Sequence, residues 1–227
     1  MILVYVNSSN GLSKAALETV TYAKKLGNEV LVLTNGKASS EILTCLGEYG
    51  ATKVLVDRSV DGEDPQQLTR LIASVAQNIS ANTVVFSHDL IGKAVAPRLS
   101  VRLQAGLIAG AISIPDTDGT VKVNVFSGKA VGQVKVSSAI KIISLLPNSI
   151  QPEKSGVNCP VEETNGLGGA AAIKVISTKK PEGEILLPEA ELVVSAGRGL
   201  KGPENWGMIE NLAKSLGAAT ACSRPVA

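Results

Sequence analysis

The residues with the clearest chemical potential form a glycine-rich loop near the C-terminal end of the chain. Gly197, Gly199 and Gly202 follow the spacing GxGxxG, between a segment expected to be a strand and one expected to be a helix. Glycines let backbone amides approach a phosphate closely, and the start of the next helix adds about half a positive charge. Arg198 and Lys201 would add full charges. The pattern predicts phosphate binding, with a tight turn carrying solvated basic side chains as the alternative.

Two polar groups follow other predicted strands. His88 precedes Asp89 at the start of a predicted helix, but no GxSxG segment accompanies it to present a nucleophile, so a capping or surface role is favoured. The polar loop Asn7–Gly11 follows the first expected strand, a position at which related folds bind adenine nucleotides. It has one glycine and no lysine of the kind that binds phosphates in GxxxxGK[ST] loops, which favours an ordinary turn.

The cysteines carry no expected catalysis or metal binding. Cys45, Cys159 and Cys222 lie far apart in sequence, and the single histidine cannot complete a zinc ligand set with them. Cys45 falls on the apolar face of a predicted helix and is expected in the core, whereas Cys159 is expected in a loop. We therefore assign no metal-ligating and no catalytic residue.

Composition narrows the class of protein. The chain has 227 residues, 44% of them hydrophobic, with 22 Lys and Arg against 20 Asp and Glu, which indicates a globular protein without the charge that draws a chain to nucleic acid. Aromatic residues make up only 3%. No apolar run approaches the roughly 20 residues that span a bilayer, so no membrane insertion is expected. Three unpaired cysteines and a start at Met1 without a basic leader predict a cytoplasmic protein.

The elements that position these residues alternate between strand and helix. Ser13, Ser39 or Ser40, and Asp64 with Pro65 are expected to cap helices, each between β-branched apolar runs. Four such units predict a Rossmann-like α/β fold, a parallel sheet with helices on both faces. The expected strands are 2–6, 29–33, 53–56 and 83–86.

The pattern changes after a further helix that is expected from Ile91 to Gln104. Strands are expected at 121–126, 131–136 and 139–145, as an added β-rich edge, followed by a surface excursion at 147–169 and a strand at 171–177. The composition of residues 179–188 is then typical of a linker, which predicts that the N-terminal domain spans residues 1–179. Residues 180–227 read as the start of a second α/β domain, with strands at 191–195 and 218–222 and a helix at 204–216.

Several segments of the chain resemble a known protein family. The segments SAGRGLKGPENW and CSRPVA, between Val193 and Ala227, resemble the opening of the FAD-binding domain of the electron transfer flavoprotein alpha subunit. GKAVAPRLSVRLQAG, from Gly92 to Gly106, resembles a helix that the family carries at the end of its first domain's parallel sheet, and the strands from FSGKAVGQVKV onward are also similar. The resemblance covers essentially the whole chain.

The resemblance implies an electron carrier subunit without substrate chemistry of its own. Family members are heterodimers in which the alpha subunit holds most of the FAD and the beta subunit carries an AMP. The FAD takes electrons from flavin dehydrogenases, such as the acyl-CoA dehydrogenases of fatty acid β-oxidation, and passes them to a quinone oxidoreductase. Residue by residue, Arg198 is expected to contact FAD, and Ser223 and Arg224 to lie at the flavin, where an arginine favours the reduced anionic ring. Gly197 and Gly199 are further candidates, for close backbone approach.

The family's pattern continues beyond these 227 residues through QxGK-like and GxSGAxQH-like loops. We therefore expect this chain by itself to bind FAD weakly or not at all, and its first domain to act as a scaffold for the beta subunit. Two alternatives remain open. One is an adenine-nucleotide-binding module similar to universal stress proteins, and the other is a fragment of an NAD-dependent dehydrogenase that uses the GxGxxG loop.

Overall fold

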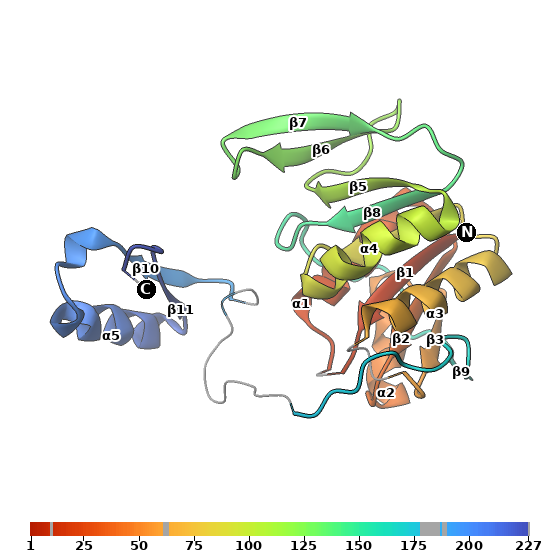
Figure 1. Cartoon of the computed structure of the whole chain (residues 1–227), viewed down its shortest axis with the longest axis horizontal. Helices are drawn as coiled ribbons and strands as arrows, with labels where there is room; N and C mark the ends of the chain where they lie inside the picture. The colour runs from red at the N-terminus through yellow and green to blue at the C-terminus, as the bar shows by residue number, and fades with distance from the viewer. Residues whose placement is uncertain (10, 61–63, 178–186, 188–189, 227) are drawn as a thin grey trace. The chain divides into compact units, whose positions relative to one another are not determined.

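A computed structural model describes residues 1–9, 11–60, 64–177, 187 and 190–226 of the chain. The chain divides into two compact units, Met1–Val175 and Ile176–Ala227 (Figure 1). The boundary expected between residues 179 and 180 lies outside the described residues. No helix within the described residues is long and apolar enough to cross a membrane.

The first unit opens with four strand-helix repeats, as the sequence predicted. Each helix begins where a polar side chain accepts a hydrogen bond from a free backbone amide. The caps are Ser13, Ser39, Asp64 and Asp89, and Pro65 occupies the first turn of its helix. The elements are β1 (Ile2–Asn7), α1 (Lys14–Leu26), β2 (Val30–Asn35), α2 (Ser40–Thr44) continued by the 3₁₀ helix η1 (Cys45–Tyr49), β3 (Lys53–Asp57), α3 (Pro65–Asn78), β4 (Thr83–Ser87) and α4 (Leu90–Leu103).

The described residues of this unit form one nine-stranded sheet in the order β7-β6-β5-β8-β4-β1-β2-β3-β9. The remaining strands are β5 (Gly106–Ala111), β6 (Thr120–Val125), β7 (Ala130–Lys135), β8 (Lys141–Leu145) and β9 (Val161–Thr164). All neighbouring pairs are parallel except β5 with β6 and β6 with β7. The predicted Rossmann-like sheet with an added antiparallel edge is thereby confirmed.

Two apolar cores cover the two faces of the sheet. Successive side chains of a strand point to opposite faces, so alternate residues of β1, such as Val4 and Leu3, belong to different cores. One core joins the strands to α1 and to α2 with η1, for example through Val20 and Leu46. The other joins them to α3 and α4, which lie side by side in Figure 1, through residues such as Leu71.

Three expectations about this unit need correction. Residues 106–111, which were not predicted as a strand, form β5 beside β8. Within the expected surface excursion, residues 161–164 form the edge strand β9 beside β3. Residues 171–177 are not a strand. The edge position beside β3 is already occupied by β9, and the apolar side chains of Ile173 and Ile176 remain exposed.

The second unit is small. Its strands β10 (Val193–Ala196) and β11 (Ala219–Cys222) are parallel neighbours, and α5 (Trp206–Leu216) connects them. The helix was expected to begin at Glu204. Instead, two short 3₁₀ helices, η3 (Arg198–Leu200) and η4 (Pro203–Asn205), separate β10 from α5.

Candidate functional site

The glycine-rich loop leaves the carboxyl end of β10, the edge at which open parallel α/β sheets bind ligands. Three of its amides donate inside the loop: Leu200 N to Gly197 O at 3.0 Å, Lys201 N to Arg198 O at 3.2 Å, and Gly202 N to Leu200 O at 2.9 Å. The Asn205 side chain also donates to Leu200 O, at 2.8 Å. These bonds stabilise the loop. Because three of its amides already donate within the loop, those amides are not available to bind a phosphate.

The loop forms one wall of a pocket of about 510 Å³. Two cations, Arg198 and Lys201, share this pocket with apolar and aromatic groups. Within residues 187 and 190–226, neither cation takes part in an ion pair. Such a lining suits a ligand that joins an anionic group to an apolar ring. The lining residues are Gly197, Arg198, Leu200, Lys201, Gly202, Pro203, Trp206, Cys222, Pro225 and Val226.

The glycines contribute space rather than an unusual backbone conformation. A side chain at Gly199 would meet no atom within 4 Å, and one at Gly197 would meet only Ser223 Oγ, at 3.6 Å. Neither glycine has a positive φ, whereas Lys201 has a φ of 69°. The open space at Gly199 leaves room for a close approach to the backbone beside Arg198, although Gly199 itself does not line the pocket.

Of the five site residues expected from the sequence, Gly197 and Arg198 line the pocket, whereas Gly199, Ser223 and Arg224 do not. Ser223 N donates to Ala196 O at 3.0 Å, which places Ser223 beside Gly197 and close to Arg198. Arg224 follows in the chain and is exposed, but it does not line the pocket. Sequence reasoning did not select Trp206 or Pro225. Both lie inside the segments GPENW and CSRPVA, so their position was the available signal.

His88 and Asp89 have structural roles. Asp89 Oδ1 accepts from Gly92 N at 2.8 Å and caps α4. His88 Nδ1 lies 2.9 Å from Ser144 Oγ, on the neighbouring strand β8. Burial holds the pKa of His88 below its usual value, and the nearby Lys93 lowers it further while Asp89 opposes the shift. The cap formed by Asp89 fits the expected capping role, and the half-buried His88 bonded to Ser144 shows no catalytic triad among the described residues.

The polar loop after β1 is already engaged with its own fold. Ser8 Oγ donates to Asn35 O at 2.8 Å and receives a hydrogen bond from Thr34 Oγ1, also at 2.8 Å. Asn10, which belongs to the predicted nucleotide loop, lies outside the described residues. The described contacts favour an ordinary turn.

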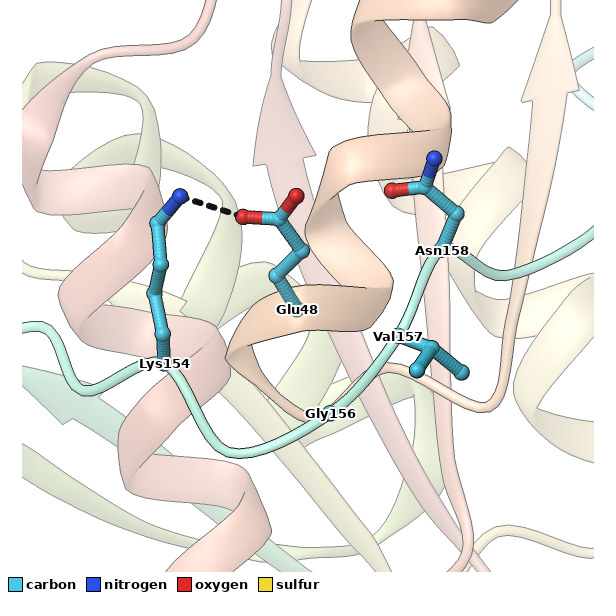
Figure 2. A pocket seen from close by; sticks show the side chains of 5 residues that line it. All are labelled: Glu48, Lys154, Gly156, Val157 and Asn158. Carbon is cyan, nitrogen blue, oxygen red and sulfur yellow. Dashed lines mark ion pairs between the residues drawn. The ribbon is translucent and has the colours of Figure 1, made fainter.

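A second pocket, of about 640 Å³, lies between η1 and the segment 153–159. Figure 2 shows its lining, in which Lys154 Nζ pairs with Glu48 Oε2 at 2.5 Å. The Ser155 and Gly156 amides both donate to Glu48 O, at 2.7 and 3.1 Å. Because the cation of this pocket is already neutralised by a carboxylate, it is a weaker candidate for an anionic ligand than the pocket of the second unit.

A parallel α/β unit, followed by a glycine-rich strand-loop-helix with free cations, is typical of proteins that bind nucleotide cofactors. Residues 2–179 match the model of the electron transfer flavoprotein domain, and residues 186–227 match that of the electron transfer flavoprotein FAD-binding domain. The chain therefore belongs to the electron transfer flavoprotein family, and within this family it is similar to the alpha subunits.

Curated relatives agree with the family models. The chain is 31% identical over 243 residues to the electron transfer flavoprotein subunit alpha of Syntrophomonas wolfei, covering 97% of this chain and 72% of the relative. The corresponding protein of Bacillus subtilis is 31% identical over 86% of this chain and 62% of its own length. That of Pseudomonas aeruginosa is 29% identical over 98% of this chain and 73% of its own length. The chain thus spans roughly two thirds of the length of these relatives.

Proposed function

We propose that this chain works as the alpha subunit of an electron transfer flavoprotein and contributes one side of a FAD site. Its partner is an electron transfer flavoprotein beta subunit that carries an AMP. In this proposal the pair moves electrons from flavin dehydrogenases, such as those that oxidise acyl-CoA, to a quinone oxidoreductase. The chain carries out no substrate chemistry of its own. Residues 1–179 serve as a scaffold for the partner, and 180–227 begin the FAD-binding domain.

The pocket that contains Arg198 carries this proposal. FAD supplies the redox chemistry when it is bound. On this side of the cofactor, Arg198 would neutralise phosphate charge and Gly199 would leave room for a close approach. Ser223 would donate a hydrogen bond, and the positive charge of Arg224 would stabilise the reduced, anionic flavin.

The expected affinity of the isolated chain is low. The buried apolar residues in the described part of the second unit are Ala190, Ala213 and Ala219, and most of the pocket's lining is exposed or half-buried. Such a site loses part of its binding free energy in ordering its own loops. A stoichiometric yellow flavin spectrum from the isolated chain would contradict this expectation.

The test is the FAD affinity of the chain mixed with a beta subunit, measured by equilibrium dialysis for Arg198→Ala and for Lys214→Ala. Lys214 is an exposed cation on α5 outside the pocket, so its removal changes net charge equally. Loss of a hydrogen bond to a charged group costs about 1.5–3 kcal/mol, so Arg198→Ala should weaken binding by roughly 10-fold or more. Lys214→Ala should change it less than about 2-fold.

Equal effects of the two substitutions would remove Arg198 from the site. If the mixture bound AMP or ATP but no flavin, the adenine-nucleotide module would replace the electron carrier. Intrinsic fluorescence of Trp206, the single tryptophan of the chain, gives a second measure of binding because this residue lines the pocket.

A further inference from the structure

Two cysteines that are 114 residues apart in the sequence meet beside η1. Cys45 is the first residue of η1 and is half-buried, whereas Cys159, in the segment 153–159, is 6% exposed. Cys45 was expected in the core and is instead only half-buried, so that expectation was wrong. Cys159 lies in a loop, as expected, and the contact between segment 153–159 and η1 buries it there.

Backbone hydrogen bonding sets the distance between the two cysteines. Cys159 N donates to Thr44 O at 3.1 Å, and Thr44 O lies on the peptide group that leads directly into Cys45. Adding standard peptide dimensions to this bond keeps the two Cα atoms within about 7 Å of each other. Disulfide-bonded cysteines have Cα separations of about 4.4–6.8 Å. The backbone therefore needs little movement to admit a bond.

The side chains also approach the same carbonyl. Cys159 Sγ lies 3.7 Å from Thr44 O, while the Cys45 thiol donates to Ile42 O at 2.9 Å. Both groups are free thiols in this structure. The close approach depends on Gly47, because a Cβ there would lie closer than 3.0 Å to Cys159 N.

We propose that Cys45 and Cys159 form a reversible disulfide that fastens segment 153–159 to η1. With glutathione disulfide as the oxidant, the Cys45 thiolate attacks one glutathione sulfur and releases the first glutathione. The Cys159 thiolate then attacks Cys45 Sγ in the mixed disulfide and releases the second. Two protein thiols are oxidised, glutathione disulfide is reduced to two glutathiones, and these take up the two protons.

The surroundings make the reaction slow at neutral pH. Burial raises the pKa of the Cys45 thiol, Glu48 raises it further, and Lys154 partly offsets both. Burial also raises the pKa of Cys159. Because the thiolate is the reacting form and burial holds the pKa of both thiols above the usual cysteine range, the rate should increase as the pH rises above that range. The disulfide would be a slow marker of oxidising conditions rather than a rapid sensor.

The test uses Cys222→Ser as the background, because Cys222 is exposed and would form bonds between molecules. The folded chain is equilibrated with a series of glutathione redox buffers, quenched with acid and analysed by intact mass and non-reducing peptide mapping. We expect a species lighter by two hydrogen atoms that contains the Cys45–Cys159 cross-linked peptides. Its fraction should be at least ~10-fold greater in the folded chain than in concentrated urea, because folding raises the effective thiol concentration.

Three variants in this background act as controls. Cys159→Ser should accumulate glutathione on Cys45, and Cys45→Ser should leave Cys159 unmodified because it is buried. Glu153→Gln, which removes an exposed ion pair with Lys25 at the edge of the segment, should form the disulfide normally. A mixed disulfide on Cys45 without the cross-link, or equal cross-linking in folded and unfolded chains, would overturn the proposal. Circular dichroism spectra establish that each variant is folded.

Discussion

Gly47 offers a sharp test of how tightly segment 153–159 packs on η1. A Cβ at this position would lie closer than 3.0 Å to three backbone atoms, Val157 O, Cys159 N and the carbonyl carbon of Asn158. Backbone atoms cannot rotate away as a flexible side chain can. Gly47→Ala must therefore displace either the segment or η1, whose Leu46 is completely buried.

The cost follows from the hydrogen bonds that displacement would break. Three backbone hydrogen bonds join the described residues of the segment to α2 and η1: Ser155 N and Gly156 N donate to Glu48 O, and Cys159 N donates to Thr44 O. At about 1 kcal/mol each, their loss with partial loss of packing gives a decrease of roughly 2–4 kcal/mol in the free energy of unfolding. Hydrogen exchange of the segment's amides should accelerate as well.

Urea unfolding followed by far-ultraviolet circular dichroism measures this cost, because most of the secondary structure lies in the first unit. Gly132→Ala on β7 is the matched control, since its Cβ would meet only ordinary contacts, the nearest at 3.4 Å. It should change the free energy of unfolding by less than about 1 kcal/mol. If Gly47→Ala unfolded at the same urea concentration as the parent chain, the inferred tight packing would be wrong.

Two further predictions concern helix caps. Burial tends to raise the pKa of Asp64, but backbone amides led by those of Ala172 and Gln66 outweigh this and hold it below its usual value. Since the folded pKa is the lower one, the stabilisation is present above the unfolded pKa of about 4 and disappears as pH falls through the folded value. Acid titration of the melting temperature should thus be shallower for Asp64→Asn than for the parent chain. Asp89→Ala removes the cap of α4 and should cost about 1 kcal/mol in urea unfolding, whereas Asp116→Ala, outside any helix, should be nearly neutral.

The parallel part of the sheet and its helices could be predicted from the sequence because the patterns that indicate them extend over only a few residues. Ser13 and the pair Asp64–Pro65 mark helix starts through bonds to amides two or three residues away. Strands β1 and β2 are buried almost throughout, so they appear as continuous apolar runs.

Edge strand β9 was missed for the opposite reason. Val161 is its only strongly apolar residue, and its two carboxylates form ion pairs with residues distant in sequence. Glu162 pairs with Lys53 at 2.5 Å, and Glu163 pairs with Arg58 at 2.7 Å. Exposed ion pairs of this kind contribute little to the free energy of folding, and no local sequence pattern predicts them. Residues 171–177 were wrongly predicted as a strand. Their apolar pattern is typical of a strand, but they pair with no neighbouring strand among the described residues.

The candidate site was also only partly accessible from the sequence. The GxGxxG spacing identified the loop, and the resemblance to the family added Ser223 and Arg224. The apolar wall made by Trp206 and Pro225 was not identified, because it depends on β11 returning beside β10 after α5.

By itself, the sequence determined the starts of the helices in the first unit, the run of parallel strands, the loop that carries Arg198 and membership of a family. Tertiary structure alone decided that β8 lies between β4 and β5, that β9 closes the far edge, and that Cys159 forms a hydrogen bond with Thr44, the residue before Cys45. The division has a physical cause. Capping and amphipathic patterns act over a few residues, whereas strand order and contacts across more than a hundred residues depend on which apolar faces bury one another.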